Sequence, residues 1–296
     1  MTFHRGVSLP TATTFGFADT ADVGPTAGNG FYHGWPDDLA ALQELGITDV
    51  RLTLDWPRLQ QKPGDLDPDW TERFENILAA AAAIELRTWA TLYDGSVPRW
   101  FDNEGGFADA DTFSTWWPRW VERAADAFGD RVDGWVPFDV IPAGAAQPWR
   151  DTWGVIGGTQ PVVASIDGDG IADLGTYVGR MNRVGLRLDT PWTPDESIAD
   201  ERFEQTADEW GTAVRAACDA VDDEPVLITG FRPGHDDLDV ASRITTSIST
   251  VLDQALDDGV PVDAMFFEPG IAGHDASAAL LSADRSPTVI ADAFLG

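Results

Sequence analysis

The chain has 296 residues, of which 43% are apolar, enough to bury one large core. Its 50 acidic residues outnumber its 19 basic residues and give a formal net charge of −31. A field of this sign repels nucleic-acid phosphates and anionic lipids, so we expect no nucleic-acid partner and no membrane partner.

Short apolar or β-branched segments alternate with amphipathic segments along the chain, which favours a parallel sheet with crossover helices. The predicted strands are 6–10, 49–56, 86–94, 132–140, 161–167, 183–189, 225–231 and 262–268. Helix signals lie between them: Gly46 ends one helix, Asp67 or Asp69 can cap the next, and Gly259 ends another. Eight such units predict an α/β protein, a (β/α)8 TIM barrel that forms one domain over residues 1–296.

The pattern weakens between strands four and six. Residues 141–160 contain Pro, Gly and Trp but no convincing helical periodicity. We therefore expect a shortened segment there, with one outer helix of the barrel missing.

The remaining bulk features concern location and partners. The start, MTFHRGVSLP, lacks the basic and apolar regions of a secretory signal, and the longest apolar run, 77–84, is far below the roughly 20 residues that span a bilayer. Cys218 is the single cysteine and cannot form an intrachain disulfide. We expect a cytoplasmic protein whose acidity is a solvated shell, from a salt-rich cytoplasm or a GC-rich genome; a cationic partner is the alternative.

Several motifs, in order, resemble the family one glycoside hydrolases, the β-glucosidase type of retaining glycosidase. FYHGWPDDLAALQELGITDVRLTLDWPRLQ is similar to the family's opening helix and second strand, and ATLYDGSVPRW to its third. FGDRVDGWVPFDVIP resembles F-G-D-R-V-K-x-W-x-T-x-N-E-P, and PVLITGFRPG resembles P-x-x-I-T-E-N-G. The resemblance covers about 31–140 and 225 to the end, is thin between 141 and 224, and implies the same barrel.

The resemblance does not extend to the family's chemistry. Retaining glycosidases use two carboxyl groups ~5 Å apart, one as acid/base and one as nucleophile. In the matched motifs these positions are Val140 and Gly230, neither of which can donate a proton or attack a sugar carbon. The family's sugar-binding positions are also replaced, by Thr13, Asp94, Gly95, Asp139, His274 and Asp275.

New charged residues stand at the carboxyl ends of the predicted strands, where barrels of this type place their sites. If the protein is an enzyme, the candidate catalytic groups are Asp94, Asp139 and Glu268, since crowded carboxylates raise one another's pKa. Arg51, which in the family supports the nucleophile, needs another anion here. The residues expected to line the pocket are Thr13, Arg51, Asp55, Asp94, Asp139, Asp189, Phe231, Arg232, His235, Glu268, Trp149, Trp153 and Trp192, with Asp167 on the fifth strand.

Each of these residues also has a structural interpretation. Aspartates after strands commonly cap helices, His235 stands in a turn beside two aspartates, and the three tryptophans can pack in the shell. The run IDGDGIAD (166–173) lacks the third acid and terminal Glu of a calcium loop, so a tight turn is expected. We expect no metal and no cofactor.

Three hypotheses follow. The first is a pseudo-glycosidase that acts as a binding, regulatory or structural module for a sugar-like or cationic small molecule, a protein partner or a second copy. The second is an enzyme of changed chemistry that uses the relocated carboxylates on a different substrate, with or without a metal, and has two or three of them within ~3–6 Å and one pKa perturbed. The third is glycoside hydrolysis through displaced carboxylates that flank an open slot.

Overall fold

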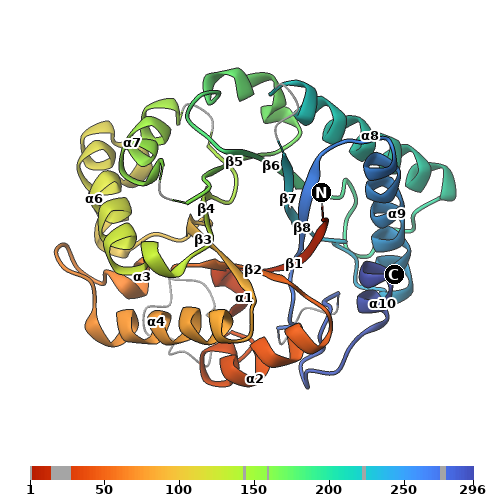
Figure 1. The fold of residues 1–296 in the computed structure, drawn as a ribbon, viewed down its shortest axis with the longest axis horizontal. Helices are drawn as coiled ribbons and strands as arrows, with labels where there is room; N and C mark the ends of the chain where they lie inside the picture. Colours follow the sequence, from red (N-terminus) through yellow and green to blue (C-terminus); the bar gives the residue numbers. More distant parts are fainter. Residues whose placement is uncertain (1, 15–27, 143–144, 159, 222–224, 274–277) are drawn as a thin grey trace.

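The structure is a computed structural model, which describes all residues except 1, 15–27, 143–144, 159, 222–224 and 274–277. Its centre is a ring of parallel strands surrounded by helices (Figure 1). The strands are β1 His4–Leu9, β2 Asp49–Thr53, β3 Arg87–Tyr93, β4 Gly134–Phe138, β5 Val163–Ile166, β6 Arg183–Leu188, β7 Val226–Phe231 and β8 Val262–Phe267. Each predicted strand overlaps one of these.

The strands pair in the order β4-β3-β2-β1-β8-β7-β6-β5, all parallel. A parallel bridge between Trp135 of β4 and Val162 beside β5 joins the two edges, so the barrel is nearly closed. The predicted (β/α)8 TIM barrel is confirmed. In this arrangement the carboxyl ends of all eight strands meet at one mouth.

Aspartate caps begin two of the outer helices. Asp67 accepts hydrogen bonds from the backbone of Asp69 and Trp70 at the start of α4, and Asp237 does the same for α9. The α-helices are α1 Thr11–Thr14, α2 Phe31–Glu44, α3 Trp56–Leu59, α4 Pro68–Ala83, α5 Arg99–Asn103, α6 Ala110–Phe128, α7 Ala146–Ile156, α8 Asp200–Asp219, α9 Leu238–Asp257 and α10 Val289–Leu295. Short 3-10 helices are η2 Gly106–Ala108, η3 Gly129–Arg131 and η4 Asp169–Thr176.

The prediction that an outer helix is missing within residues 141–160 is wrong. Helix α7 lies there and buries Pro148, Trp149, Thr152 and Ile156 on one face. Its start, at Ala145, has no side-chain cap, and Pro148 lies in the first turn, where proline is tolerated. The irregular crossover instead joins β5 to β6, where the 3-10 helix η4 stands in place of an α-helix.

The main core lies between the barrel and its helices, and aromatic residues fill much of it. Trp56 and Trp120 stack with ring centroids 5.3 Å apart, and Trp117 stacks on Phe138 at 4.7 Å. None of the helices in the described part of the chain is long and apolar enough to cross a membrane.

Candidate functional site at the barrel mouth

The barrel interior is apolar at its base. Side chains from alternating inward positions form a separate buried cluster of Trp89, Val136, Val163, Leu227, Ala264 and Phe266. Nearer the carboxyl ends of the barrel strands, the inward positions become polar or charged, with Ser8, Arg51, Ser165 and Arg187 among them. The apolar cluster therefore serves as a floor beneath a layer of polar groups.

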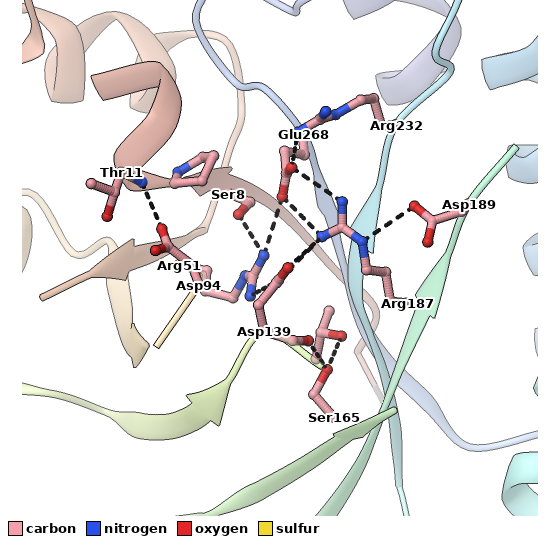
Figure 2. Close-up of polar contacts among 12 residues, drawn as sticks. Ser8, Thr11, Arg51, Asp94, Asp139, Ser165, Arg187, Asp189, Arg232 and Glu268 are labelled. Carbon is pink, nitrogen blue, oxygen red and sulfur yellow. Dashed lines mark hydrogen bonds and ion pairs between the residues drawn. The ribbon is translucent and has the colours of Figure 1, made fainter. Parts of the chain in front are cut away.

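Two arginines and two carboxylates interlock in this layer (Figure 2). Arg51 Nη1 donates to Asp139 Oδ1 at 2.6 Å, and its Nη2 donates to Glu268 Oε2 at 3.2 Å. Arg187 Nη1 lies 3.0 Å from Asp139 Oδ2 and 3.3 Å from Glu268 Oε2, and its Nη2 lies 3.2 Å from Glu268 Oε1. Each carboxylate is thus bound by both guanidinium groups.

Neighbouring groups hold this network in place. Ser8 accepts from Arg51 Nη2 at 2.7 Å, and the Ser165 hydroxyl donates to the backbone oxygen of Asp139 at 2.6 Å. Arg232, which is about half exposed, also donates to Glu268. Arg187 Nε donates to Asp189 at 3.2 Å, at the exposed edge of the network.

The charges around Glu268 and Arg187 shift the pKa of both side chains. Burial alone would raise the pKa of Glu268, but Arg187, Arg232 and Arg51 together outweigh burial and hold that pKa far below its ordinary value. Burial would lower the pKa of Arg187, but Glu268 and Asp139 raise it above its ordinary value. Glu268 and Arg187 are therefore both charged near neutral pH.

Asp94 lies in a separate part of the mouth. Its Oδ2 accepts from the backbone N–H of Thr11 at 2.7 Å, whereas its buried Oδ1 has no hydrogen-bond partner among the described residues. Burial raises the pKa of Asp94, the backbone and hydroxyl of Thr11 and the hydroxyl of Thr53 lower it, and the charge of Asp139 raises it. Unlike Asp139 and Glu268, Asp94 forms no ion pair among the described residues.

Asp55 is a helix cap rather than a member of the network. Its side chain accepts from the backbone N–H of Arg58 at the start of α3 and pairs with the Arg58 guanidinium. The carboxyl is fully buried, and burial raises its pKa to about 6, although Arg58 lowers it. Its place as the N-cap of α3 gives it a structural role.

Gly230 adjoins the network directly. A Cβ atom added at Gly230 would lie 2.8 Å from Arg187 Nη1 and 3.6 Å from Arg51 Nη2. The guanidinium of Arg187 therefore fills the space that a side chain at position 230 would enter. Val140 follows Asp139 at the end of β4 and is only partly buried.

Other expected pocket residues lie away from the network. His235 is held within its turn, with Nε2 2.9 Å from the backbone oxygen of Glu196 and Nδ1 accepting from Asp237 N at 3.0 Å. The indoles of Trp149 and Trp192 are buried and donate to the backbone oxygens of Arg180 and Pro233.

The rest of the expected set is peripheral. Trp153 is partly exposed on α7, Thr13 lies in α1, and Phe231 packs against Trp210 and Phe267 in the outer core. His274 and Asp275 lie outside the described residues.

Residues 166–173 form the end of β5 and most of η4, where Asp167 accepts from Gly170 N. Among the described residues no group of three or more His, Cys, Asp and Glu side chains could hold a metal ion.

Sequence reasoning missed Arg187, the residue that joins both carboxylates. A signal for it was present, because Arg187 stands two positions before Asp189 on β6 and so faces the same side of the sheet. Ser8, Ser165 and Thr229 were also missed, although they too lie on the strands that form the barrel. Ser165 and Thr229 lie 2.7 Å apart beneath Asp139.

Comparison with known proteins supports the predicted resemblance. The family "Glycosyl hydrolase family 1" matches residues 17–149. A β-glucosidase from Agrobacterium is 26% identical over 123 residues, which cover 41% of this chain and 25% of that protein. β-Glucosidase A from Thermotoga maritima is 23% identical over 137 residues, 46% of this chain and 29% of that protein. The match thus spans little more than a quarter of these relatives.

Solved structures extend the likeness of fold over the whole barrel. The β-glycosidase BGL167 has a TM-score of 0.78 at 14% identity, with 99% of this chain and 96% of that chain covered. A β-glucosidase from Thermotoga maritima in complex with castanospermine has a TM-score of 0.74 at 12% identity, with the same coverage. The chain therefore shares the TIM-barrel fold of these proteins, and its residues 17–149 are similar to the family one glycoside hydrolases.

Proposed function

We propose that this barrel is a pseudo-glycosidase, a small-molecule-binding module without retaining glycosidase activity. The observation that carries the proposal is the position of Arg187. Its guanidinium lies beside Gly230, where the family resemblance expects the nucleophile, and it binds both Asp139 and Glu268. The space between these carboxylates holds a guanidinium group, whereas a retaining site needs a sugar there.

The charge state of the pair supports the same conclusion. A general acid must carry a proton near the working pH, and its ideal pKa lies close to that pH. Three arginines hold the pKa of Glu268 far below its ordinary value, so Glu268 has no proton to donate to a leaving group. As a nucleophile it would have to give up ion pairs with Arg51, Arg187 and Arg232.

Turnover of a panel of aryl β-glycosides between pH 4 and 9 tests the proposal. The parent protein is assayed at high concentration beside an Asp139→Asn, Glu268→Gln double variant, with a family one β-glucosidase as the positive control. We expect no turnover by either form of the chain. Turnover by the parent that disappears in the folded double variant would overturn the proposal and indicate a hydrolytic site rebuilt from displaced carboxylates.

A second candidate is an enzyme of changed chemistry centred on Asp94. The observation that favours it is the buried Oδ1 of Asp94, which has no hydrogen-bond partner among the described residues, on a carboxyl whose pKa is raised chiefly by burial. A buried carboxyl with a raised pKa at a barrel mouth is a candidate general acid or base.

The test of this candidate uses chromogenic glycosides and esters. An Asp94→Asn variant should lose about 10²- to 10⁴-fold of any turnover, as expected for a general acid or base. The matched control is Asp189→Asn, since Asp189 is exposed at the edge of the network. Equal activity in the two variants would eliminate Asp94 as the catalytic group.

A further inference from the structure

A cavity next to the ion network opens beside the irregular β5–β6 crossover. It has a volume of about 500 Å³ and lies between the residues that follow β5, the end of β6 and the middle of α8. This size is within the range of small-molecule sites. The 3-10 helix η4, which replaces a full crossover helix, borders this space.

The floor of the cavity is apolar and rigid. Leu188 and Trp210 line it and are almost completely buried. The Trp210 ring packs edge-to-face against Phe231 at 5.5 Å, and its indole N–H points to the backbone oxygen of Asp189. An apolar or aromatic ligand body would therefore find a preformed wall.

The rim of the cavity is acidic. Asp167, Asp169, Asp189 and Glu209 line it, and of these only Asp189 pairs with a cation among the described residues. Its partner, Arg187, also lines the cavity, but all three guanidinium nitrogens already bind carboxylates. The rim thus carries uncompensated negative charge next to an apolar wall.

A hydroxyl on the cavity wall offers a hydrogen-bonding group to a ligand. Thr206 lines the cavity and is 3% exposed, but its hydroxyl is not one of the fully buried polar atoms that lack a partner, so the hydroxyl is open to the cavity. A ligand hydrogen-bonding group in the cavity would satisfy this hydroxyl.

We propose that this lateral cavity binds an organic ammonium ion with a compact apolar or aromatic body. The body packs on Trp210 and Leu188, the ammonium group faces the acidic rim, and one of its N–H groups donates to Thr206. A cation close to an indole face gains further attraction from the ring. The proposal goes beyond the function proposed for the barrel mouth and does not depend on whether the mouth hydrolyses glycosides.

Three probes of nearly equal shape and different charge test the site: phenethylammonium, 2-phenylethanol and phenylacetate. Each is titrated into the full chain and followed by calorimetry. We expect phenethylammonium to bind at least ~10-fold more tightly than either of the others, because only its charge complements the rim. Equal affinity for the neutral alcohol would overturn the assignment of a cation site.

Variants on α8 separate a specific site from the general attraction of an acidic protein for cations. Glu209→Gln should weaken phenethylammonium binding about three- to tenfold, the usual size of one nearby charge at a protein surface. Thr206→Val should weaken it by a similar factor, because it removes the hydroxyl at nearly constant volume.

The matched control is Asp208→Asn, which removes the same charge from the adjacent, exposed position that does not line the cavity. It should leave the affinity within about twofold. If Asp208→Asn weakened binding as much as Glu209→Gln, the attraction would be diffuse and the proposed site would be wrong. Aryl glycoside turnover is measured separately, so failure of either proposal can be recognised without the other.

Discussion

Arg187 and Gly230 face each other across adjacent strands, and the guanidinium of Arg187 occupies the space beside the glycine. The two residues are register partners in the β6–β7 pair, at a point where the register shifts. An added Cβ on Gly230 would be 2.8 Å from Arg187 Nη1, closer than a carbon and a nitrogen atom pack. The glycine and the arginine are therefore mutually dependent: a side chain at position 230 requires Arg187 to move.

Replacing Gly230 with alanine tests this dependence. The new methyl group must displace the Arg187 guanidinium, which is held by Asp139 and Glu268, so Gly230→Ala should destabilise the protein by about 1–3 kcal/mol, the usual cost of overpacking. The measurement is the free energy of unfolding from denaturant titration.

The control is Gly211→Ala on α8, where an added Cβ meets only Val251 at an ordinary 3.5 Å. There alanine should be neutral or stabilising by up to ~1 kcal/mol, because it favours the helix. A Gly230→Ala variant as stable as the parent would mean that Arg187 is not confined by its carboxylates.

The Glu268 carboxylate is predicted to stabilise the fold chiefly through its charge. Glu268→Gln leaves the buried Arg51 and Arg187 with Asp139 as their shared partner, and breaking a buried pair in this way costs about 3–5 kcal/mol. Asp189→Asn also removes a partner of Arg187, but Asp189 is exposed, so its loss should cost no more than about 1 kcal/mol. The measurement is the free energy of unfolding of both variants. An equal loss of stability in the two would show that burial of Glu268 does not strengthen its ion pairs.

The same carboxylate gives a pH dependence of known sign. Because the arginines lower the pKa of Glu268 in the folded state, its contribution is complete above the ordinary glutamate pKa and is lost as pH falls. The stability gap between the parent and Glu268→Gln should therefore be constant above about pH 5 and shrink as pH falls below about 4. A gap that widened in acid would contradict the lowered pKa.

Trp149 is predicted to stabilise α7 rather than bind a ligand. Its ring is buried against Phe138 and Tyr177, and its indole donates to the backbone oxygen of Arg180 at 2.9 Å. Trp149→Phe removes this hydrogen bond and part of the ring, which should cost about 1–3 kcal/mol. Trp153→Phe, at a partly exposed position of the same helix, should cost less. Thermal unfolding followed by circular dichroism makes the comparison, and a larger loss at Trp153 would contradict it.

The strands and most outer helices could be predicted because their signals are local. Apolar runs marked each strand, and an aspartate such as Asp67 marked a helix start that the structure confirms. Helix α7 lacked such a signal, because Ala145 provides no side-chain cap. Pro148 also reads as a helix breaker in the sequence, although it lies in the first turn. Its buried positions at 148, 149, 152 and 156 do follow helical spacing, and a count of that periodicity would have found it.

The ion network was only partly predictable because its pairing is not local. The strand ends indicated Asp139 and Glu268, and the family resemblance indicated that Arg51 needs an anion. The partner that links them, Arg187, is 48 residues from Asp139 and 81 from Glu268 along the chain. Which charges meet across a barrel depends on register and on the bulges in β6 and β7, which the sequence pattern does not specify.

Asp55 gives a prediction opposite in sign to that for Glu268. Burial raises the pKa of Asp55 to about 6 in the folded state, above its ordinary value of 3.8. The folded protein therefore binds more protons at this group than the unfolded chain does between about pH 4 and 6. The stability of the parent relative to Asp55→Asn, which keeps the cap but cannot ionise, should fall as pH rises through this interval. A shift of about 2 pKa units corresponds to roughly 3 kcal/mol.

Denaturant titrations of both proteins at pH 4, 5, 6 and 7 measure this difference in the free energy of unfolding. A difference that stays constant over this interval would show that Asp55 ionises as easily in the fold as in the unfolded chain, with Arg58 fully offsetting the effect of burial.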